Sequence, residues 1–268
     1  MKEIQSERNT VVKDYIRAMR GKQTGAEELL LPLEGFNLIN SALAEGFEVK
    51  QFFFCDEIAE NKSLETVFSK LSDKTPAFNV SPAVLRKITT AKTPQGIAAL
   101  VAYPRYKIEK LLGDLNLRAI LVDELQDPGN FGTIIRTAAA ADFDAVLFTP
   151  GTANLFNPKV LRSTAGALFH IKVLSTGDTA LFAEEIKALD INVIAASPGI
   201  EQIYYNLAYK PPLILVIGNE NKGISDILSA VAYEKASIPM MRGVESLNAA
   251  VAASILIFEA QKQNLKLD

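Results

Sequence analysis

The sequence has almost none of the residues that build metal centres or disulfides. It contains one cysteine, Cys55, one histidine, His170, and no tryptophan among 268 residues. A single cysteine excludes an intramolecular disulfide, and one cysteine with one histidine provides too few soft ligands for a structural zinc site. We therefore expect neither a metal centre nor histidine-based catalysis.

Long apolar runs are also missing. No run approaches the roughly 18 to 20 apolar residues that span a bilayer, and residues 1–22 are mixed in charge and lack the apolar core of a signal peptide. With 49% hydrophobic and 22% charged residues, the composition is that of a globular protein with a sizeable core. We expect no membrane partner and a cytoplasmic location.

Positive charge is concentrated in two segments of a chain whose net charge is −3. Residues 1–22 contain six Lys or Arg against three acids, and residues 84–110 contain six against one. Such segments are typical either of a phosphate-contacting surface for nucleic acid or of solvated loops and helix faces. The charge pattern alone does not decide between these two interpretations.

The first half of the chain alternates between strands and helices. Residues 1–23 form an extension whose apolar residues fall near helical spacing up to Gly21, and residues 24–103 have the size of a small α/β domain. Ser81 and Pro82 predict the cap and first turn of one helix. We expect strands at 29–33, 49–55, 77–80 and 96–103, helices at 36–44, 64–71 and 83–89, and a linker at 104–117.

A second alternation fills residues 118–268. Several of its strands are almost entirely apolar, as expected when helices cover both faces of a parallel sheet. We expect strands at 119–123, 145–149, 171–174, 192–196, 213–217 and 236–238, and helices at 133–141, 158–169, 179–189, 225–234 and 248–264.

Three segments that follow strands carry chemistry. In the first, a Pro128-Gly129-Asn130 turn precedes a helix in which Arg136 would lie one turn from the start, among apolar residues. A guanidinium there needs a partner, which a phosphate or a developing alkoxide would provide. A structural salt bridge is the other interpretation, slightly favoured by this segment alone, with an acid such as Asp123, Glu124 or Glu220.

The second segment, residues 217–225, follows the strand at 213–217. Gly218 and Gly223 would allow close backbone approach to a ligand, with Glu220 in the turn between them. Lys222 precedes the second glycine, so the segment is not a phosphate-binding P-loop, and no G-x-G-x-x-G follows a strand, which disfavours a nicotinamide enzyme. A simple strand-to-helix turn is the alternative.

The third segment joins Ile238-Pro239-Met240 to Ser246-Leu247-Asn248, just before an apolar helix. Ser246 or Asn248 makes a good N-cap, which is a sufficient explanation of either residue. Polar side chains at a helix start can equally orient a ligand, because unpaired backbone N–H groups gather there.

In this order, the three segments resemble the three motifs of the SpoU (TrmH-like) RNA ribose methyltransferases of the SPOUT class. The resemblance covers residues 118–262 and includes residues 157–168, whereas residues 24–102 are more weakly similar to the L30e-like RNA-binding domain of some members. The chain departs from the family where Ala249 and Ala250 replace the usual Val-Ser, and where Ala141 and Asp142 replace Phe-Gly. The matching motifs are Asn130-x-Gly132-x-x-x-Arg136, Gly218-Asn219-Glu220-x-x-Gly223, and Ile238-Pro239-Met240 with Ser246-Leu247-Asn248.

The resemblance implies an α/β fold in which a C-terminal parallel-sheet domain, residues 118–268, contains a deep trefoil knot and follows a small L30e-like α/β domain. It implies S-adenosylmethionine as cofactor, a homodimer formed through the C-terminal domain, and methylation of a ribose 2′-hydroxyl in structured RNA, ribosomal rather than transfer RNA. A transfer RNA methyltransferase and a non-catalytic RNA-binding factor of the same fold are the alternatives. The implied catalytic residues are Arg136, Asn130, Glu220, Ser246 and Asn248, and the implied cofactor-binding residues are Leu147, Thr149, Ile217, Gly218, Asn219, Ile238, Met240, Leu247 and Asn248.

Overall fold

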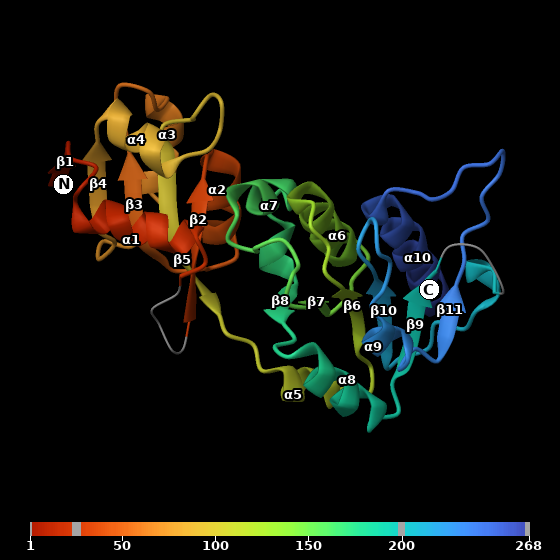
Figure 1. Cartoon of the computed structure of the whole chain (residues 1–268). Helices are drawn as coiled ribbons and strands as arrows, with labels where there is room; N and C mark the ends of the chain where they lie inside the picture. Colours follow the sequence, from red (N-terminus) through yellow and green to blue (C-terminus); the bar gives the residue numbers. More distant parts are fainter. Residues whose placement is uncertain (1, 23–27, 198–201, 266–268) are drawn as a thin grey trace. The chain divides into compact units, whose positions relative to one another are not determined.

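The structure, a computed structural model, describes residues 2–22, 28–197 and 202–265. The chain forms two compact units (Figure 1). The N-terminal unit comprises Met1–Arg105 together with Asn154–Phe169, and the C-terminal unit comprises Tyr106–Ala153 and His170–Asp268. Each unit contains a sheet covered by helices, so the predicted α/β class is confirmed.

The sheet of the N-terminal unit has five strands in the order β1-β4-β3-β5-β2. Strand β5 runs antiparallel to both β2 and β3, whereas β4 runs parallel to β1 and β3. The short edge strand β1 was not predicted from the sequence. The strands are β1 (Lys2–Ile4), β2 (Glu28–Glu34), β3 (Val49–Phe54), β4 (Ala77–Val80) and β5 (Ile97–Pro104).

Helices cover both faces of this sheet, and the aromatic residues of β3 show which helix lies on which face. Side chains alternate along a strand. Phe53 packs edge-on against Tyr15 of α1 (Thr10–Met19), on the face that also receives α4 (Pro82–Ile88). Phe52 and Phe54 pack against Phe68 of α3 (Asn61–Phe68), which contacts α2 (Phe36–Ala44).

The segment Asn154–Phe169 packs with the N-terminal unit, although it lies between two strands of the other sheet in the sequence. Its helix α7 (Pro158–Ser163) carries Arg162, which pairs with the buried carboxylate of Glu34 and donates to the Thr90 hydroxyl at 2.7 Å. Desolvation lowers the pKa of Arg162. A short 3₁₀ helix, η1 (Ala167–His170), follows α7 where the sequence predicted one continuous helix.

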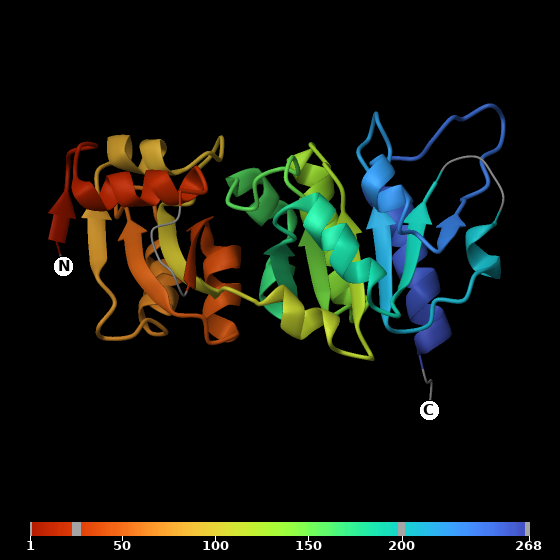
Figure 2. The same cartoon turned by 60° about the horizontal axis from the view of Figure 1, so that its bottom comes forward.

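The sheet of the C-terminal unit contains six parallel strands, as predicted, and their order in the structure is β11-β9-β10-β6-β7-β8 (Figure 2). Its strand β10 is buried along its whole length, and the neighbouring β6 is buried except at its first residue, Arg118. The trefoil knot implied by the resemblance remains a prediction. The strands are β6 (Arg118–Val122), β7 (Ala145–Phe148), β8 (Lys172–Ser175), β9 (Asn192–Ala196), β10 (Leu213–Ile217) and β11 (Glu234–Ala236).

Two groups of helices cover this sheet. One face packs against α5 (Ile108–Leu112), α8 (Thr179–Lys187) and α9 (Asp226–Ser229). Strands β7 and β10 contact α6 (Pro128–Ala140) and α10 (Ala249–Asn264), which pack against each other, and a 3₁₀ turn, η2 (Tyr204–Asn206), lies beside α10. Helix α5 lies in the segment expected to be a linker, and its Leu111 and Leu112 join the core of this unit.

Several predicted boundaries are wrong. Helix α6 begins at Pro128 rather than near residue 133, because the Asp127 side chain caps the helix and Pro128 occupies its first position. The expected Pro-Gly-Asn turn is therefore the first turn of the helix, and Arg136 lies about two turns from the start. Strand β11 ends at Ala236, α9 is shorter than predicted, and α3 begins three residues before residue 64.

Candidate active site

The carboxyl ends of β6, β7 and β10 are joined by one buried carboxylate. Asp123, which is 2% exposed, directly follows β6. Its Oδ1 accepts from the Thr149 hydroxyl after β7 at 3.0 Å, and its Oδ2 accepts from the backbone N–H of Ser225 at 2.7 Å, beyond the loop that follows β10. A buried carboxylate is costly unless it is hydrogen-bonded, so this pairing holds three segments together at one edge of the sheet.

Glu124 extends the same network through its backbone. Its N–H donates to the Thr149 hydroxyl at 2.9 Å, and its carbonyl accepts from the side-chain amide of Asn219 at 2.7 Å. These bonds hold Glu124 at a φ of 50°, a left-handed conformation that only short polar residues and glycine adopt readily. The edge of the sheet is therefore fixed by hydrogen bonds before any ligand binds.

The two ends of the loop after β10 are joined by hydrogen bonds. Asn219 and Gly223 exchange two backbone hydrogen bonds, at 2.9 and 3.0 Å. A Cβ on Gly218 would lie 2.3 to 2.5 Å from backbone atoms of Gly223 and Ile224, closer than real Cβ contacts. From its sequence, Gly218 was expected to allow close approach of a ligand, but the space beside it is occupied by the loop's own backbone.

Replacing Gly218 with alanine is therefore expected to open this loop. The added Cβ cannot fit without moving backbone, so we expect a clear fall in melting temperature and at least a tenfold weaker binding of S-adenosylmethionine, measured by calorimetry. Gly113→Ala is the matched control, because its Cβ would meet nothing closer than 3.5 Å. Equal behaviour of the two variants would refute the role given to Gly218.

Three residues that the sequence placed in different motifs form one hydrogen-bonded chain. The side-chain amide of Asn248 donates to Asn130 Oδ1 at 2.9 Å, and the amide of Asn130 donates to Glu220 Oε1 at 3.1 Å. Asn248 also caps α10 by accepting from the N–H groups of Ala250 and Val251. Asn248, not Ser246, is therefore the N-cap of this helix.

The direction of each hydrogen bond in this series follows from the groups at its two ends, the Glu220 carboxylate and the start of α10. Because a carboxylate only accepts, Asn130 must present its NH₂ group to Glu220 and its carbonyl to Asn248. Because the carbonyl of Asn248 accepts from the start of α10, its NH₂ group must face Asn130. These hydrogen bonds thus fix the start of α6 and the start of α10 to the loop after β10.

Glu220 is fixed as a carboxylate. Partial burial acts to raise the pKa of Glu220, but hydrogen bonds from its own backbone N–H, from Asn130, and from the N–H groups of Gln126 and Asp127 outweigh burial and lower it. The last two donors lie at 3.3 Å, at the start of α6. A carboxyl group with a lowered pKa is a poor proton carrier at neutral pH, so Glu220 is suited to orient Asn130.

These side chains line an open hollow of about 570 Å³ at the edge of the sheet. Its walls come from the start of α6, the loop after β10 and the start of α10, and they are polar. Such a surface can hydrogen-bond hydroxyl, amide or phosphate groups. The lining residues are Gln126, Asp127, Pro128, Asn130, Glu220, Asn221 and Asn248.

Arg136 lies outside this hollow. It follows Asn130 by six residues, which is about 9 Å along the helix axis and on a different side of α6. Its side chain is exposed and forms no hydrogen bond or ion pair with any residue that the structure describes. The structural salt bridge considered for Arg136 is therefore wrong, and its guanidinium is available to a group outside the chain.

The residues that the resemblance implies for cofactor binding occupy different environments. The Leu147 side chain lies in the core, the Thr149 hydroxyl is used by Asp123 and Glu124, and Asn219 braces its own loop by accepting from the N–H groups of Asn221 and Lys222. Ile217 and Gly218 end β10 and begin that loop. Ile238, Met240 and Leu247 are half-buried, and Ser246 is exposed.

Asp123 and Asp127 are the residues of this edge that the sequence analysis missed. Asp123 was considered only as a partner for Arg136, although an acid that ends an apolar strand is buried there and needs donors. Asp127 was given no role, although an acid before Pro-Gly is a typical N-cap. Both signals are present in the sequence.

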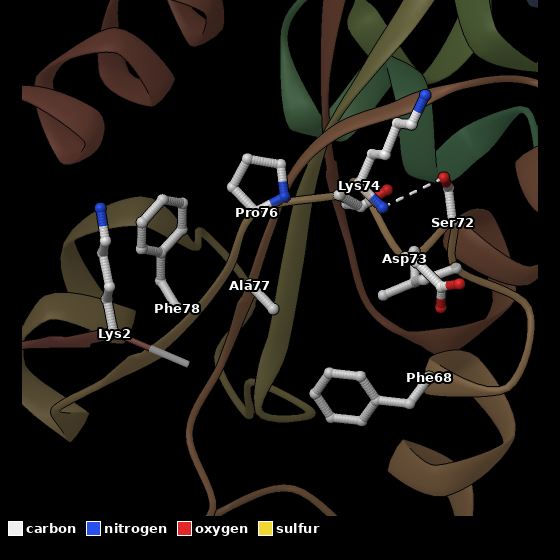
Figure 3. Close-up of a pocket in the computed structure, with 10 residues that line it drawn as sticks. Lys2, Phe68, Ser72, Asp73, Lys74, Pro76, Ala77 and Phe78 are labelled. Carbon is white, nitrogen blue, oxygen red and sulfur yellow. Dashed lines mark hydrogen bonds between the residues drawn. The ribbon is translucent and has the colours of Figure 1, made fainter.

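The N-terminal unit has a hollow of its own, of about 470 Å³, between α3 and β4. Figure 3 shows Lys2 and Lys74 lying on either side of Pro76, and the hydrogen bond drawn there joins the Lys74 backbone to Ser72. No connected set of side chains comparable to Asn248, Asn130 and Glu220 is drawn among the labelled residues. We therefore place the candidate active site in the C-terminal unit.

Comparison with known proteins agrees with this placement. A model of the SpoU rRNA methylase family matches residues 118–258, more than half of the chain. The chain belongs to the SpoU rRNA methylase family. A second model, of the MRM3-like substrate binding domain, matches residues 9–99.

Relatives of this SpoU-family chain extend over its whole length. The 23S rRNA (guanosine(2553)-2'-O)-methyltransferase RlmP of Bacillus subtilis is 33% identical over 96% of this chain and 98% of the relative. An AdoMet-bound rRNA methyltransferase from Sinorhizobium meliloti is 27% identical with a TM-score of 0.82, and the match covers 99% of both chains. The SpoU methyltransferase AviRb of Streptomyces viridochromogenes, 24% identical with a TM-score of 0.84 over 97% of this chain and 99% of AviRb, shares the fold.

Proposed function

We propose that this chain transfers a methyl group from S-adenosylmethionine to a ribose 2′-hydroxyl of ribosomal RNA. The observation that carries the proposal is the hydrogen-bonded chain of Asn248, Asn130 and Glu220, which unites the three family motifs at one hollow. Relatives that match almost the whole chain are named 23S rRNA 2'-O-methyltransferases or were solved with AdoMet, and they support both the substrate and the cofactor.

The residues near this edge fit S-adenosylmethionine. Ile238, Met240 and Leu247 offer half-buried apolar side chains to an adenine ring. The hydroxyl of Ser225 is buried and has no hydrogen-bond partner among the described residues, so it is free to meet a polar group of the cofactor. The cofactor supplies an electrophilic methyl group, which the ribose oxygen takes by in-line displacement while a neutral thioether leaves.

The roles of the chain's own residues follow from their geometry. Glu220 holds Asn130, and Asn130 with Asn248 presents amide groups at the hollow to a polar group of the bound ligands. The exposed Arg136 stabilises the developing alkoxide and the adjacent phosphate, since a guanidinium stays protonated at neutral pH. The proton then leaves through that phosphate or water, and Ser246 supports the ligand from the loop before α10.

The N-terminal unit is proposed to hold structured RNA. The match of residues 9–99 to a substrate-binding domain supports this role. Residues 24–103 are proposed as the RNA-binding domain and 118–268 as the catalytic domain, while residues 104–117 join the two and add α5 to the core of the C-terminal unit. Within the described residues, no helix is long and apolar enough to cross a membrane. A cytoplasmic location is proposed because a curated relative is a bacterial enzyme named for 23S rRNA.

The reaction can be tested on RNA from cells with and without the gene. Total RNA is digested to nucleosides, and each 2′-O-methylnucleoside is quantified by mass spectrometry. We expect one of them to be lost in the deletion strain and restored by the wild-type gene. Purified protein with labelled S-adenosylmethionine should label the ribosomal RNA of the deletion strain. No change in any nucleoside, with no cofactor binding in vitro, would instead favour a non-catalytic RNA-binding factor.

We also propose a homodimer formed through the C-terminal unit. Val251 and Phe258 lie seven residues apart on α10, hence on one side of the helix, and each is 48% exposed. An apolar pair exposed on a helix that is otherwise packed is typical of a protein interface. The partner copy would cover these side chains.

Phe258→Asp is expected to convert the dimer into a monomer, because it buries a charge at the interface. Light scattering should give twice 29.2 kDa for the wild type and 29.2 kDa for the variant. Leu181→Asp is the matched control, since Leu181 is 73% exposed on α8. A monomeric wild type would exclude the dimer.

A further inference from the structure

The two basic segments of the sequence come together on one surface. Helices α1 and α4 contact each other on the Phe53 face of the N-terminal sheet (Figure 1). Val12 and Tyr15 of α1 share a core cluster with Val84 and Leu85 of α4. Residues 8–22 and 81–89, which are far apart in the sequence, thereby form a continuous surface that we call the α1–α4 face.

Charge is segregated between the two sides of this sheet. The α1–α4 face contains seven Lys or Arg and one acid, Asp14, within residues 8–22 and 81–89, and Glu7 lies at its border, 4.0 Å from Lys87. Residues 36–75, which supply α2, α3 and their loops, contain four Lys and seven acids. Solvated helix faces usually mix the two signs, so a surface with seven cations and only two acids, Asp14 and Glu7, needs a different explanation.

The backbone positions of these cations are set by the two helices. Lys13, Arg17 and Arg20 follow the spacing that places side chains on one side of α1, and Lys13 and Arg20 are about 10 Å apart along its axis. Arg17 pairs with Asp14, and Lys87 lies 4.0 Å from Glu7. The other cations are exposed and have no carboxylate partner within the described residues: Arg8, Lys13, Arg20, Lys22 and Arg86.

We propose that the α1–α4 face binds the phosphodiester backbone of the RNA substrate, an inference that rests on the proposed function. Unpaired ammonium and guanidinium groups on a rigid surface attract phosphates and release the counterions around them. None of the exposed large hydrophobic side chains belongs to this face, so it offers no platform for stacking an unpaired base. The contact is therefore with the backbone and depends on salt rather than on base sequence.

The test compares two triple variants that remove equal charge. Lys13→Gln, Arg20→Gln and Arg86→Gln alter the α1–α4 face, whereas Lys62→Gln, Lys70→Gln and Lys74→Gln alter exposed lysines of α3 and the segment that follows it. All six positions are exposed, so both proteins should fold and melt like the wild type. Binding to ribosomal RNA purified from the deletion strain, and to an unrelated RNA hairpin, is measured between 50 and 300 mM salt.

The α1–α4 variant is expected to bind both RNAs about 10- to 100-fold more weakly and to show a shallower salt dependence, by about 0.7 to 0.9 for each phosphate that the surface no longer neutralises. Its KM for ribosomal RNA should rise while kcat at saturating RNA and the affinity for S-adenosylmethionine stay unchanged. The α3 variant should remain within threefold of the wild type. An equal fall in affinity for the two variants, or wild-type affinity in both, would overturn the proposal.

Failure of the proposed function can be distinguished from failure of the proposed RNA contact. If the wild type binds RNA without transferring a methyl group, the reaction is wrong, and the binding comparison still decides whether the α1–α4 face contacts RNA.

Discussion

Arg136→Ala is expected to lower kcat by about 10²- to 10³-fold, the usual loss when one group that stabilises developing charge is removed. The melting temperature should stay within about 1 °C of the wild type, because the Arg136 side chain is exposed and has no partner among the described residues. The buried Ile134 and Ile135 keep α6 packed in the variant. Large catalytic loss with unchanged stability is the signature of a residue that acts on a ligand.

The control for this prediction is Lys187→Ala, which removes one exposed cation from α8 of the same unit. Its kcat should stay within twofold of the wild type. Arg136→Lys keeps the charge but loses the forked donors, so we expect partial activity. A wild-type rate that continues to rise far above neutral pH would show that Arg136 acts as a true base, against alkoxide stabilisation.

The parallel sheet could be predicted because its signal is local. Strands such as Asn192–Ala196 and Leu213–Ile217 are almost entirely apolar, and their bounds are the same in the structure. The start of α6 was missed because Pro128 and Gly129 were interpreted as a turn. The same proline is favourable at the first position of a helix when an acid such as Asp127 precedes it.

Contacts between distant segments could not be predicted from such signals. Arg162 and Glu34 are 128 residues apart in the sequence, and nothing near either residue indicates that Asn154–Phe169 packs with the N-terminal unit. The same holds for the α1–α4 face, whose two basic segments were ambiguous until the core under α1 and α4 placed them together.

In the candidate site, too, the residues could be predicted from the sequence but the contacts between them could not. The motifs identified Asn130, Glu220 and Asn248, but only the structure shows that they form one chain, with Glu220 as an acceptor at the start of α6. Arg136 was recognised through the resemblance, while spacing alone favoured a salt bridge that the structure does not contain. The residue types in the motifs predicted which side chains belong to the site. The hydrogen bonds in the structure were needed to tell the side chains that orient others from those that contact the reacting groups.

Glu220→Gln is expected to lower kcat/KM by about 100-fold, because misplacing a positioned group by about 1 Å can cost that much. A glutamine keeps one accepting oxygen but turns an NH₂ group toward the donors of Gln126, Asp127 or Asn130, so the start of α6 and the loop after β10 lose their common acceptor. Glu245→Gln, an equal change of charge at an exposed position before Ser246, should have no such effect.

The pH dependence of stability gives an independent test of the same residue. The folded-state pKa of Glu220 lies below its ordinary value of 4.5, so its ionised form stabilises the fold. That contribution is fully present above the unfolded-state pKa and is lost as pH falls through the folded-state pKa. The difference in melting temperature between wild type and Glu220→Gln should therefore be constant from about pH 5.5 to 8 and shrink below about pH 4.5. A difference that grows on acidification would mean that Glu220 is protonated in the folded protein, and its role as the fixed acceptor for Asn130 would have to be abandoned.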